Sequence, residues 1–205
     1  KTWTTSSGLS RGQAKDDIKD FLLEKTFVLR KGERILTVNY GFTNKGEKGK
    51  RPAFWSQHVL DFDGQRKNNV YWRPTTHGAD WIDDAHRVSA NGRWFATSAI
   101  AGWNGTTNRA LQRGVMFLMD YNDLQQLYDN TAATTTEWMY DDVAVPAGKT
   151  WTTTIQMIPA EGFATFTYGS ATLLGAVEAK DTPAGLRLQH TLAGVSLASP
   201  RRGAS

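Results

Sequence analysis

The chain has 205 residues, of which 40% are hydrophobic and 21% are charged. This balance excludes an intrinsically disordered protein, and the length suits one sizeable β domain or two small ones. The apolar runs are too short to cross a bilayer, so we expect no membrane insertion. The chain contains no Cys, which excludes thiolate metal sites and thiol catalysis.

The net charge is +4. Much of the positive charge lies in the glycine-containing segments 30–34 and 45–51, where Lys and Arg alternate with Glu. A nucleic-acid-binding face would need a continuous basic surface with aromatic residues between the charges. We therefore interpret these segments as solvated turns and expect no nucleic-acid partner, while a polyanionic partner stays open.

The first 21 residues are predicted to form an N-terminal extension or a short helix, because residues 14–23 can make a short helix. Apolar and polar residues then alternate through residues 27–29 and 35–42, on either side of a Lys31-Gly32 turn, which predicts a β-hairpin. The same alternation predicts later strands at residues 54–62, 94–100, 114–119, 136–140, 149–158, 163–166, 173–178 and 186–197.

Two segments are predicted to differ from a strand. Residues 121–128 can form a second short helix with Asp123 as its cap, and residues 102–105 are expected to form a turn. The whole pattern predicts an all-β fold, an antiparallel β-sandwich with at most one or two short helices. We expect the sandwich to span residues 22–180, and residues 181–205 to form a C-terminal strand and a frayed tail.

Residues 70–87, VYWRPTTHGADWIDDAHR, combine Trp, His, Asp and Arg in one stretch. We predict a long connection that leaves a strand at the open end of the sandwich and forms one wall of a site. In a sugar site, Tyr71, Trp72 or Trp81 would stack on a pyranose ring, and polar side chains would hydrogen-bond its hydroxyls. The polar side chains in this interpretation are those of Arg73, His77, Asp80 and Asp83.

Two other interpretations of this stretch stay open. Trp72 and Trp81 can be loop anchors that pack on the sandwich while the charged groups remain solvated. A metal ion would instead need ligands from several His and Asp side chains, but the His spacing specifies no ligand geometry, so we predict no metal site and no cofactor. The candidate ligands are His77, Asp80, Asp83, Asp84 and His86.

Several motifs follow one another in an informative order. V-N-Y-G-F-T-N-K-G at residues 38–46 precedes a polar stretch and an aromatic–His segment at residues 55–58. Gly-Trp at residues 102–103, an apolar segment at 114–118 and a P-A-G-x-x turn at 146–150 come later. This order resembles the galactose mutarotase-like superfamily over about residues 22–179. The resemblance implies a β-supersandwich.

The superfamily includes sugar epimerases and noncatalytic domains attached to polysaccharide lyases and glycoside hydrolases. The epimerases use a His as acid and a Glu as base across a cleft. By this resemblance His58, in the aromatic–His segment, is the candidate catalytic residue. Glu137, Glu161 and Glu178 lie in no segment that matches the Glu-bearing one. From the residues alone, His58 or His77 could pair with Asp80 or Glu137.

We predict a noncatalytic carbohydrate-recognition or accessory module of a larger exported protein, in a secreted or cell-envelope location. The alternatives are a sugar-processing enzyme (epimerase-like or lyase-associated) and a structural domain of a surface protein. The chain opens on Lys1 without a Met, so a mature or excised piece is expected. The expected partners are an oligosaccharide or polysaccharide and other domains of the parent chain. The predicted ligand-binding residues are Trp55, His58, Tyr71, Trp72, Arg73, His77, Asp80 and Trp81.

Overall fold

The computed structural model describes residues 2–8, 18, 20–64, 67–97, 101–183 and 185–195. Across these ranges the chain forms fifteen β-strands and no helix. Neighbouring strands pair in antiparallel fashion throughout. The predicted all-β antiparallel sandwich is therefore confirmed. No helix in the described part of the chain could cross a membrane.

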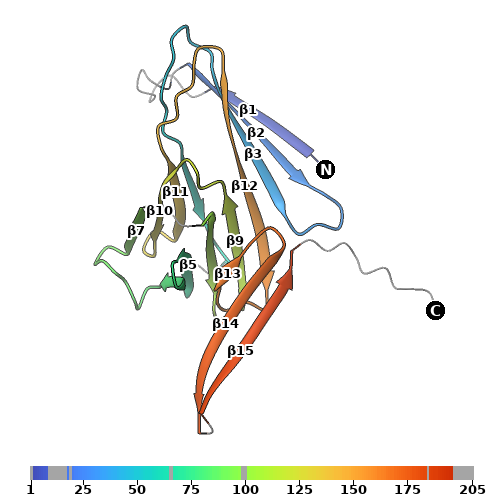
Figure 1. The fold of residues 1–205 in the computed structure, drawn as a ribbon, viewed down its shortest axis with the longest axis vertical. Helices are drawn as coiled ribbons and strands as arrows, with labels where there is room; N and C mark the ends of the chain where they lie inside the picture. Colours follow the sequence, from blue (N-terminus) through green and yellow to red (C-terminus); the bar gives the residue numbers. More distant parts are fainter. Residues whose placement is uncertain are drawn as a thin grey trace, which may run out of the picture.

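The strands form three sheets (Figure 1). The large sheet has eight strands, in the order β1 (Thr2–Gly8), β2 (Phe21–Leu29), β3 (Leu36–Asn44), β12 (Thr150–Glu161), β9 (Arg113–Met119), β8 (Trp103–Asn108), β5 (Asn69–Thr75) and β6 (Gly78–Ile82). The small sheet has four, in the order β4 (Trp55–Val59), β11 (Thr135–Tyr140), β10 (Leu124–Asn130) and β7 (Arg93–Thr97). The third sheet is β13 (Tyr168–Gly169), β14 (Leu173–Thr182) and β15 (Gly185–Gly194).

The large sheet is the middle layer, because its two faces contribute to different cores. On β9, Phe117 packs in the core shared with the small sheet, which also contains Trp138 of β11. Its neighbour Met116 points the other way, into a second core that includes Leu174 of β14. Successive strand residues point to opposite faces, so one strand can serve both cores only if both of its faces are covered.

Most predicted strands are confirmed, including the β2–β3 hairpin, whose turn contains Gly32 at a φ of 85°. A left-handed φ of this kind favours glycine. Residues 98–100 and 196–197 lie outside the described part of the chain. The prediction of a strand at residues 163–166 is wrong: Phe163 and Phe166 are buried in a loop, where their rings fill the second core.

Two further local predictions are wrong. Residues 121–128 form a turn and the start of β10, because β10 pairs with β11 on one side and β7 on the other. Residues 102–105 run into β8, whose residues are all buried between neighbouring strands and layers. Both strands are fixed by pairing with neighbouring strands on two sides, which overrides local helix and turn propensity. In the predicted helix at 14–23, residues 14–17 and 19 lie outside the described ranges, and Phe21 begins β2.

The stretch at residues 70–87 is also not the predicted long connection. Residues 69–75 and 78–82 form the β5–β6 hairpin, with Trp72 opposite Trp81. Val70 and Trp72 pack in the second core. Bends and turns follow at residues 83–92. Farther along the chain, Thr182 and Gly185 form the last pair of the β14–β15 hairpin.

Candidate functional site

The face of the small sheet that points away from the large sheet carries exposed aromatic rings. Trp55 on β4 and Phe95 on β7 are each 53% exposed. The Tyr128 ring on β10 lies between them, with ring centroids 6.2 Å from Trp55 and 4.5 Å from Phe95. Rings on an open sheet surface give a ligand a flat apolar contact that only aromatic side chains provide at this size.

Strand register aligns these rings with polar groups across all four strands. Phe95 pairs with Tyr128, Tyr128 with Glu137, and Glu137 with Gln57. Residues directly opposite one another in antiparallel strands share a face, so these four side chains form one row. Trp55 lies two residues from Gln57 on β4 and therefore on the same face. We call Trp55, Gln57, Phe95, Tyr128 and Glu137 the aromatic platform.

The polar groups of the platform are already ordered by hydrogen bonds. Gln57 Nε2 donates to Glu137 Oε1 at 2.9 Å, and Glu137 is only 2% exposed. Asn130 Nδ2 donates to the Tyr128 hydroxyl at 3.0 Å. The buried Glu137 carboxylate thus orients the exposed Gln57 amide, which can exchange hydrogen bonds with a ligand that stacks on the rings.

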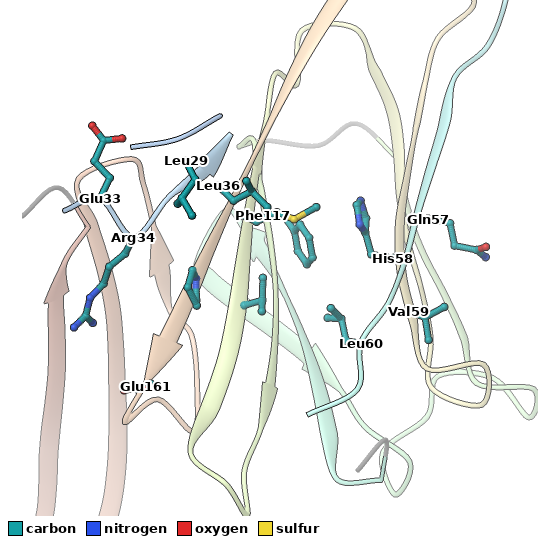
Figure 2. A pocket seen from close by; sticks show the side chains of 13 residues that line it. Leu29, Glu33, Arg34, Leu36, Gln57, His58, Val59, Leu60, Phe117 and Glu161 are labelled. Atoms are coloured by element: carbon teal, nitrogen blue, oxygen red, sulfur yellow. The ribbon is translucent and has the colours of Figure 1, made fainter. Parts of the chain in front are cut away.

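A separate cavity of about 860 Å³ opens between the two sheets beside β4. Figure 2 shows His58 on the cavity side of β4 and Gln57 on the opposite side. The cavity is lined largely by apolar side chains, with Glu33, Arg34 and Glu161 among the polar ones. Its apolar residues are Leu29, Leu36, Val59, Leu60, Val115, Phe117, Met157 and Pro159.

His58 packs as part of the core beside this cavity. Its ring stacks on Trp138 at a centroid distance of 4.8 Å and lies 4.7 Å from the Phe117 ring. Burial, with a smaller contribution from the positive charge of Lys25, lowers the pKa of His58 to about 4. The hydrogen-bond partner of its Nε2 is the Ser56 hydroxyl, at 3.0 Å. His58 and Glu137 point to opposite faces of the small sheet, so they form no acid–base pair.

Three of the predicted ligand-binding residues lie in the interior of the sandwich. Tyr71, Trp72 and Arg73 are each at most 5% exposed. Trp72 Nε1 donates to Thr107 Oγ1 at 2.9 Å. Arg73 forms an ion pair with Asp129 of the small sheet at 2.5 Å. These side chains connect the layers of the sandwich and do not contribute to the aromatic platform.

The other residues of that stretch lie at the β5–β6 hairpin. His77 and Asp80 are exposed. Trp81 is half-buried, with the Arg109 guanidinium 4.4 Å from its ring centroid and the Trp72 ring at 5.9 Å. Among the predicted residues, the structure thus brings Trp72 and Trp81 together, while Trp55 and His58 lie on opposite faces of β4.

The carboxylate of Asp83 is already engaged by protein groups. Its Oδ1 accepts hydrogen bonds from the backbone N–H groups of Ala85 and His86, at 2.9 and 2.8 Å. Its Oδ2 lies 3.3 Å from Arg109 Nη1. Burial opposes ionisation of Asp83, but the hydrogen bonds outweigh it and lower its pKa. Asp83, one of the candidate metal ligands, is thus bound by groups of the protein itself.

Chelator treatment is expected to leave the melting temperature unchanged. Within the described ranges, no group of three or more His, Asp and Glu side chains could hold a metal ion. A tightly bound metal stabilises the folded state by mass action, so its removal lowers the melting temperature. The measurement is thermal unfolding with and without EDTA, and a marked decrease on chelation would contradict this prediction.

The sequence predicted Trp55 as a ligand-binding residue. It did not predict that the other four residues of the platform share a surface with it; these are Gln57, Phe95, Tyr128 and Glu137. Glu137 was considered only as a catalytic partner. Phe95 and Tyr128 occupy alternating positions of strands that border each other, which is the signal that could have found them. The signal was hidden because residues 121–128 were assigned to a helix.

The chain resembles solved structures in fold. The Slr1438 protein from Synechocystis sp. PCC 6803 aligns with a TM-score of 0.53 and 8% identity, over 78% of this chain and 61% of its own. A protein from Escherichia coli K12 whose name assigns it to the aldose 1-epimerases aligns with a TM-score of 0.51 and 10% identity, over 78% and 65%. A galactose mutarotase-like protein from Clostridium acetobutylicum aligns with a TM-score of 0.49 and 7% identity, over 78% and 62%.

The alignments with TM-scores above 0.5, to the Slr1438 protein and to the Escherichia coli protein, confirm the predicted resemblance at the level of fold. The chain spans less than two thirds of the length of each of these structures. No protein-family model matches the sequence, and no curated protein matches it.

Proposed function

We propose that this chain is a noncatalytic carbohydrate-recognition module that binds an oligosaccharide or polysaccharide on the aromatic platform. The observation that carries the proposal is the row of Phe95, Tyr128, Glu137 and Gln57 across the small sheet, with Trp55 exposed beside it. The C–H face of a pyranose ring is apolar, so it stacks on Trp55 or Phe95. Its hydroxyls can then hydrogen-bond to the exposed Gln57 amide, which Glu137 holds in place from below.

The openness of the platform favours an extended glycan over a single sugar. Trp55 and Phe95 come from the outer strands of the small sheet, β4 and β7, and the Tyr128 ring lies between them. A ligand that contacts both exposed rings must therefore lie across the strands. Small-molecule sites usually enclose most of the ligand in a concave pocket, whereas a sheet face leaves one side of the ligand in water.

An epimerase-like enzyme is the second candidate, and Glu137 is the observation in its favour. Glu137 is a carboxylate in the middle of the platform, where it could serve as a base. Its neighbour in the row is Gln57, an amide that cannot exchange a proton near neutral pH. His58 points to the other face of β4, and no histidine occurs among the described residues of the platform. We therefore favour binding without turnover.

Export and attachment to other domains are part of the same proposal. Polysaccharides exposed outside the cell are the ligands that an open, strand-crossing platform suits best. We accordingly propose a secreted or cell-envelope location and other domains of the parent chain as partners.

A glycan array and a mutarotation assay together test the proposed function. We expect at least one oligosaccharide or polysaccharide to bind, and no mutarotation of simple aldoses. Binding combined with mutarotation would favour the enzyme. Neither binding nor mutarotation would overturn both sugar functions and leave a structural domain.

Trp55→Ala and Phe95→Ala are each expected to weaken glycan binding by about 1–3 kcal/mol, by analogy with the loss of stacking between aromatic side chains and planar ligands. This corresponds to roughly tenfold to a hundredfold in Kd. Isothermal titration calorimetry with the bound glycan measures the change. Both side chains are exposed, so the melting temperature should change little.

The matched control is Tyr168→Ala, which removes an equally exposed aromatic ring from β13, on a different sheet. Its Kd should equal that of the wild type. Equal losses in all three variants would show that the platform is not the binding surface.

A further inference from the structure

The β14–β15 hairpin projects from the body of the molecule (Figure 1). At its base, Leu174, Ala176 and Ala193 pack in the second core. Farther along, the two strands remain paired in unbroken register from Leu173 opposite Gly194 to Thr182 opposite Gly185. We call this hairpin the arm.

One face of the arm is an exposed apolar stripe. Leu186, Leu188 and Leu192 lie on one face of β15 and are 54–67% exposed, and His190 occupies the same face between Leu188 and Leu192. Val177, opposite His190 on β14, adds to the same face at 43%. The intervening residues of β15 include Arg187 and Gln189 on the opposite face. Such alternation is typical of a strand that is buried on one side, yet here the apolar side faces water.

The outer edge of the arm is also open. Among the described strands, β15 has a neighbour only on its β14 side. Natural edge strands usually carry Lys, Pro or a bulge that prevents pairing with another chain. β15 contains no Pro, no Lys and no register shift, and Arg187 is its one permanently charged residue. Nothing in the chemistry of this edge opposes a further strand.

We propose that β15 pairs antiparallel with β15 of a second copy of this chain and joins the two arms into one sheet. A two-fold axis at Gln189 places Leu186 opposite Leu192 of the other copy, and an axis at His190 places Leu188 opposite Leu192. Both registers keep the apolar stripes of the two copies on one continuous face, because opposed residues share a face. Arg187 then lies opposite Thr191 or Ala193, so no like charges meet.

The spacing of the leucines on β15 matches itself when two copies pair antiparallel. We therefore infer that the partner of β15 is a second copy of this chain. A leucine stripe on an edge strand with a single permanent charge matches a partner with leucines at the same two-residue spacing, and β15 of a second copy meets that requirement. The dimer would carry two aromatic platforms, which would raise the avidity for a repetitive polysaccharide. The dimer itself does not depend on the proposed function, since it rests on the arm alone.

Sedimentation equilibrium of the wild-type chain should show a concentration-dependent dimer. Leu188→Lys combined with Leu192→Lys should give a monomer, or raise the dimer dissociation constant at least about tenfold, because Lys on an edge strand opposes pairing with another chain. In the His190 register the two introduced charges also lie directly opposite each other and repel. Val88→Lys, at an exposed valine in the segment between β6 and β7, is the matched control and should leave the dimer intact. Circular dichroism and the melting temperature check that each variant folds.

Disulfide trapping provides a second test, because the chain contains no Cys. A residue on the two-fold axis faces its own copy at a Cα distance of about 4.5–5.5 Å, which a disulfide can bridge. Either Gln189→Cys or His190→Cys should therefore form a covalent dimer on mild oxidation, seen on a non-reducing gel. Lys180→Cys, exposed on the inner strand β14, should not.

A wild-type chain that is monomeric at all concentrations would overturn the proposal, as would a dimer that the Leu188→Lys and Leu192→Lys changes leave intact. Failure of both central cysteines to crosslink would overturn it as well. Glycan binding by a monomer would leave the proposed function standing, so the two failures are distinguishable.

Discussion

Replacing Asp129 by Ala is expected to lower the free energy of unfolding by about 3–5 kcal/mol, the usual cost of breaking a buried ion pair by removing one partner. Asp129 and Arg73 form an ion pair at 2.5 Å, and their side chains are 0% and 3% exposed. Asp129 also accepts a hydrogen bond from Thr136 Oγ1 at 2.7 Å. Its removal leaves the guanidinium charge buried between the two sheets without a counter-charge.

The remaining contacts of Arg73 cannot replace that carboxylate. The guanidinium lies 3.4 Å from the Trp94 ring centroid and donates to the Trp94 carbonyl at 3.0 Å. Its Nε and Nη1 atoms have no hydrogen-bond partner within the described residues. A carbonyl and a ring face satisfy one donor but do not neutralise a buried charge.

Equilibrium urea unfolding measures the effect, and Asp84→Ala is the matched control. Asp84 forms an ion pair with Arg87 at 2.8 Å, but the two side chains are 53% and 36% exposed. Exposed pairs contribute about 0–1 kcal/mol, so this variant should unfold close to the wild type. Asp129→Leu combined with Arg73→Met should recover much of the stability lost in Asp129→Ala. Equal losses for Asp129→Ala and Asp84→Ala would contradict the prediction.

The second large effect is a loss of stability on acidification that depends on His58. The pKa of His58 is lowered to about 4 in the folded chain, whereas an unfolded His titrates near 6.5. Between these values the unfolded state binds more protons, so the free energy of unfolding falls as the pH is lowered. The contribution of His58 is fully present above about pH 6.5 and amounts to about 3 kcal/mol at most.

Urea unfolding at pH values between about 7 and 4 tests this effect. Carboxylates also titrate in this range, so the informative quantity is the difference between wild type and His58→Phe. Phe keeps a ring between Phe117 and Trp138 but cannot be protonated, and its stability should fall less on acidification. His77→Phe, which makes the same replacement at an exposed histidine of the β5–β6 hairpin, is the matched control. Identical pH dependence in wild type and His58→Phe would contradict a lowered pKa at His58.

The class of fold was predictable because strand alternation is a local property. In residues 35–42, Leu36, Val38, Tyr40 and Phe42 lie on one face, and the structure places that face in the core between the sheets. The resemblance to galactose mutarotase-like proteins rests instead on short motifs, such as V-N-Y-G-F-T-N-K-G at residues 38–46, and on their order along the chain. The wrong predictions concern segments whose local propensity favours one structure while tertiary pairing imposes another. Residues 121–128, predicted as a helix, are an example.

The candidate site was predicted only in part. Trp55 was expected to contact a ligand, and it lies exposed on the platform. Trp72 and Arg73 were expected beside it, yet they lie in the interior. The sequence of a strand rich in aromatic and charged residues does not reveal whether one of its faces is open to solvent or both are covered. In β5 both faces are covered, so these side chains are buried.

The sequence by itself therefore determined the all-β class and the strand order along the chain, because both depend on neighbours a few residues apart. Only the tertiary structure decided which rings meet. Phe95, Tyr128, Glu137 and Gln57 come from four strands of which only β10 and β11 follow each other in the chain, and the pairing of β7, β10, β11 and β4 brings them into one row. The physical reason is register: a shift of one residue turns every side chain of a strand to the opposite face, and only the packed layers select the register.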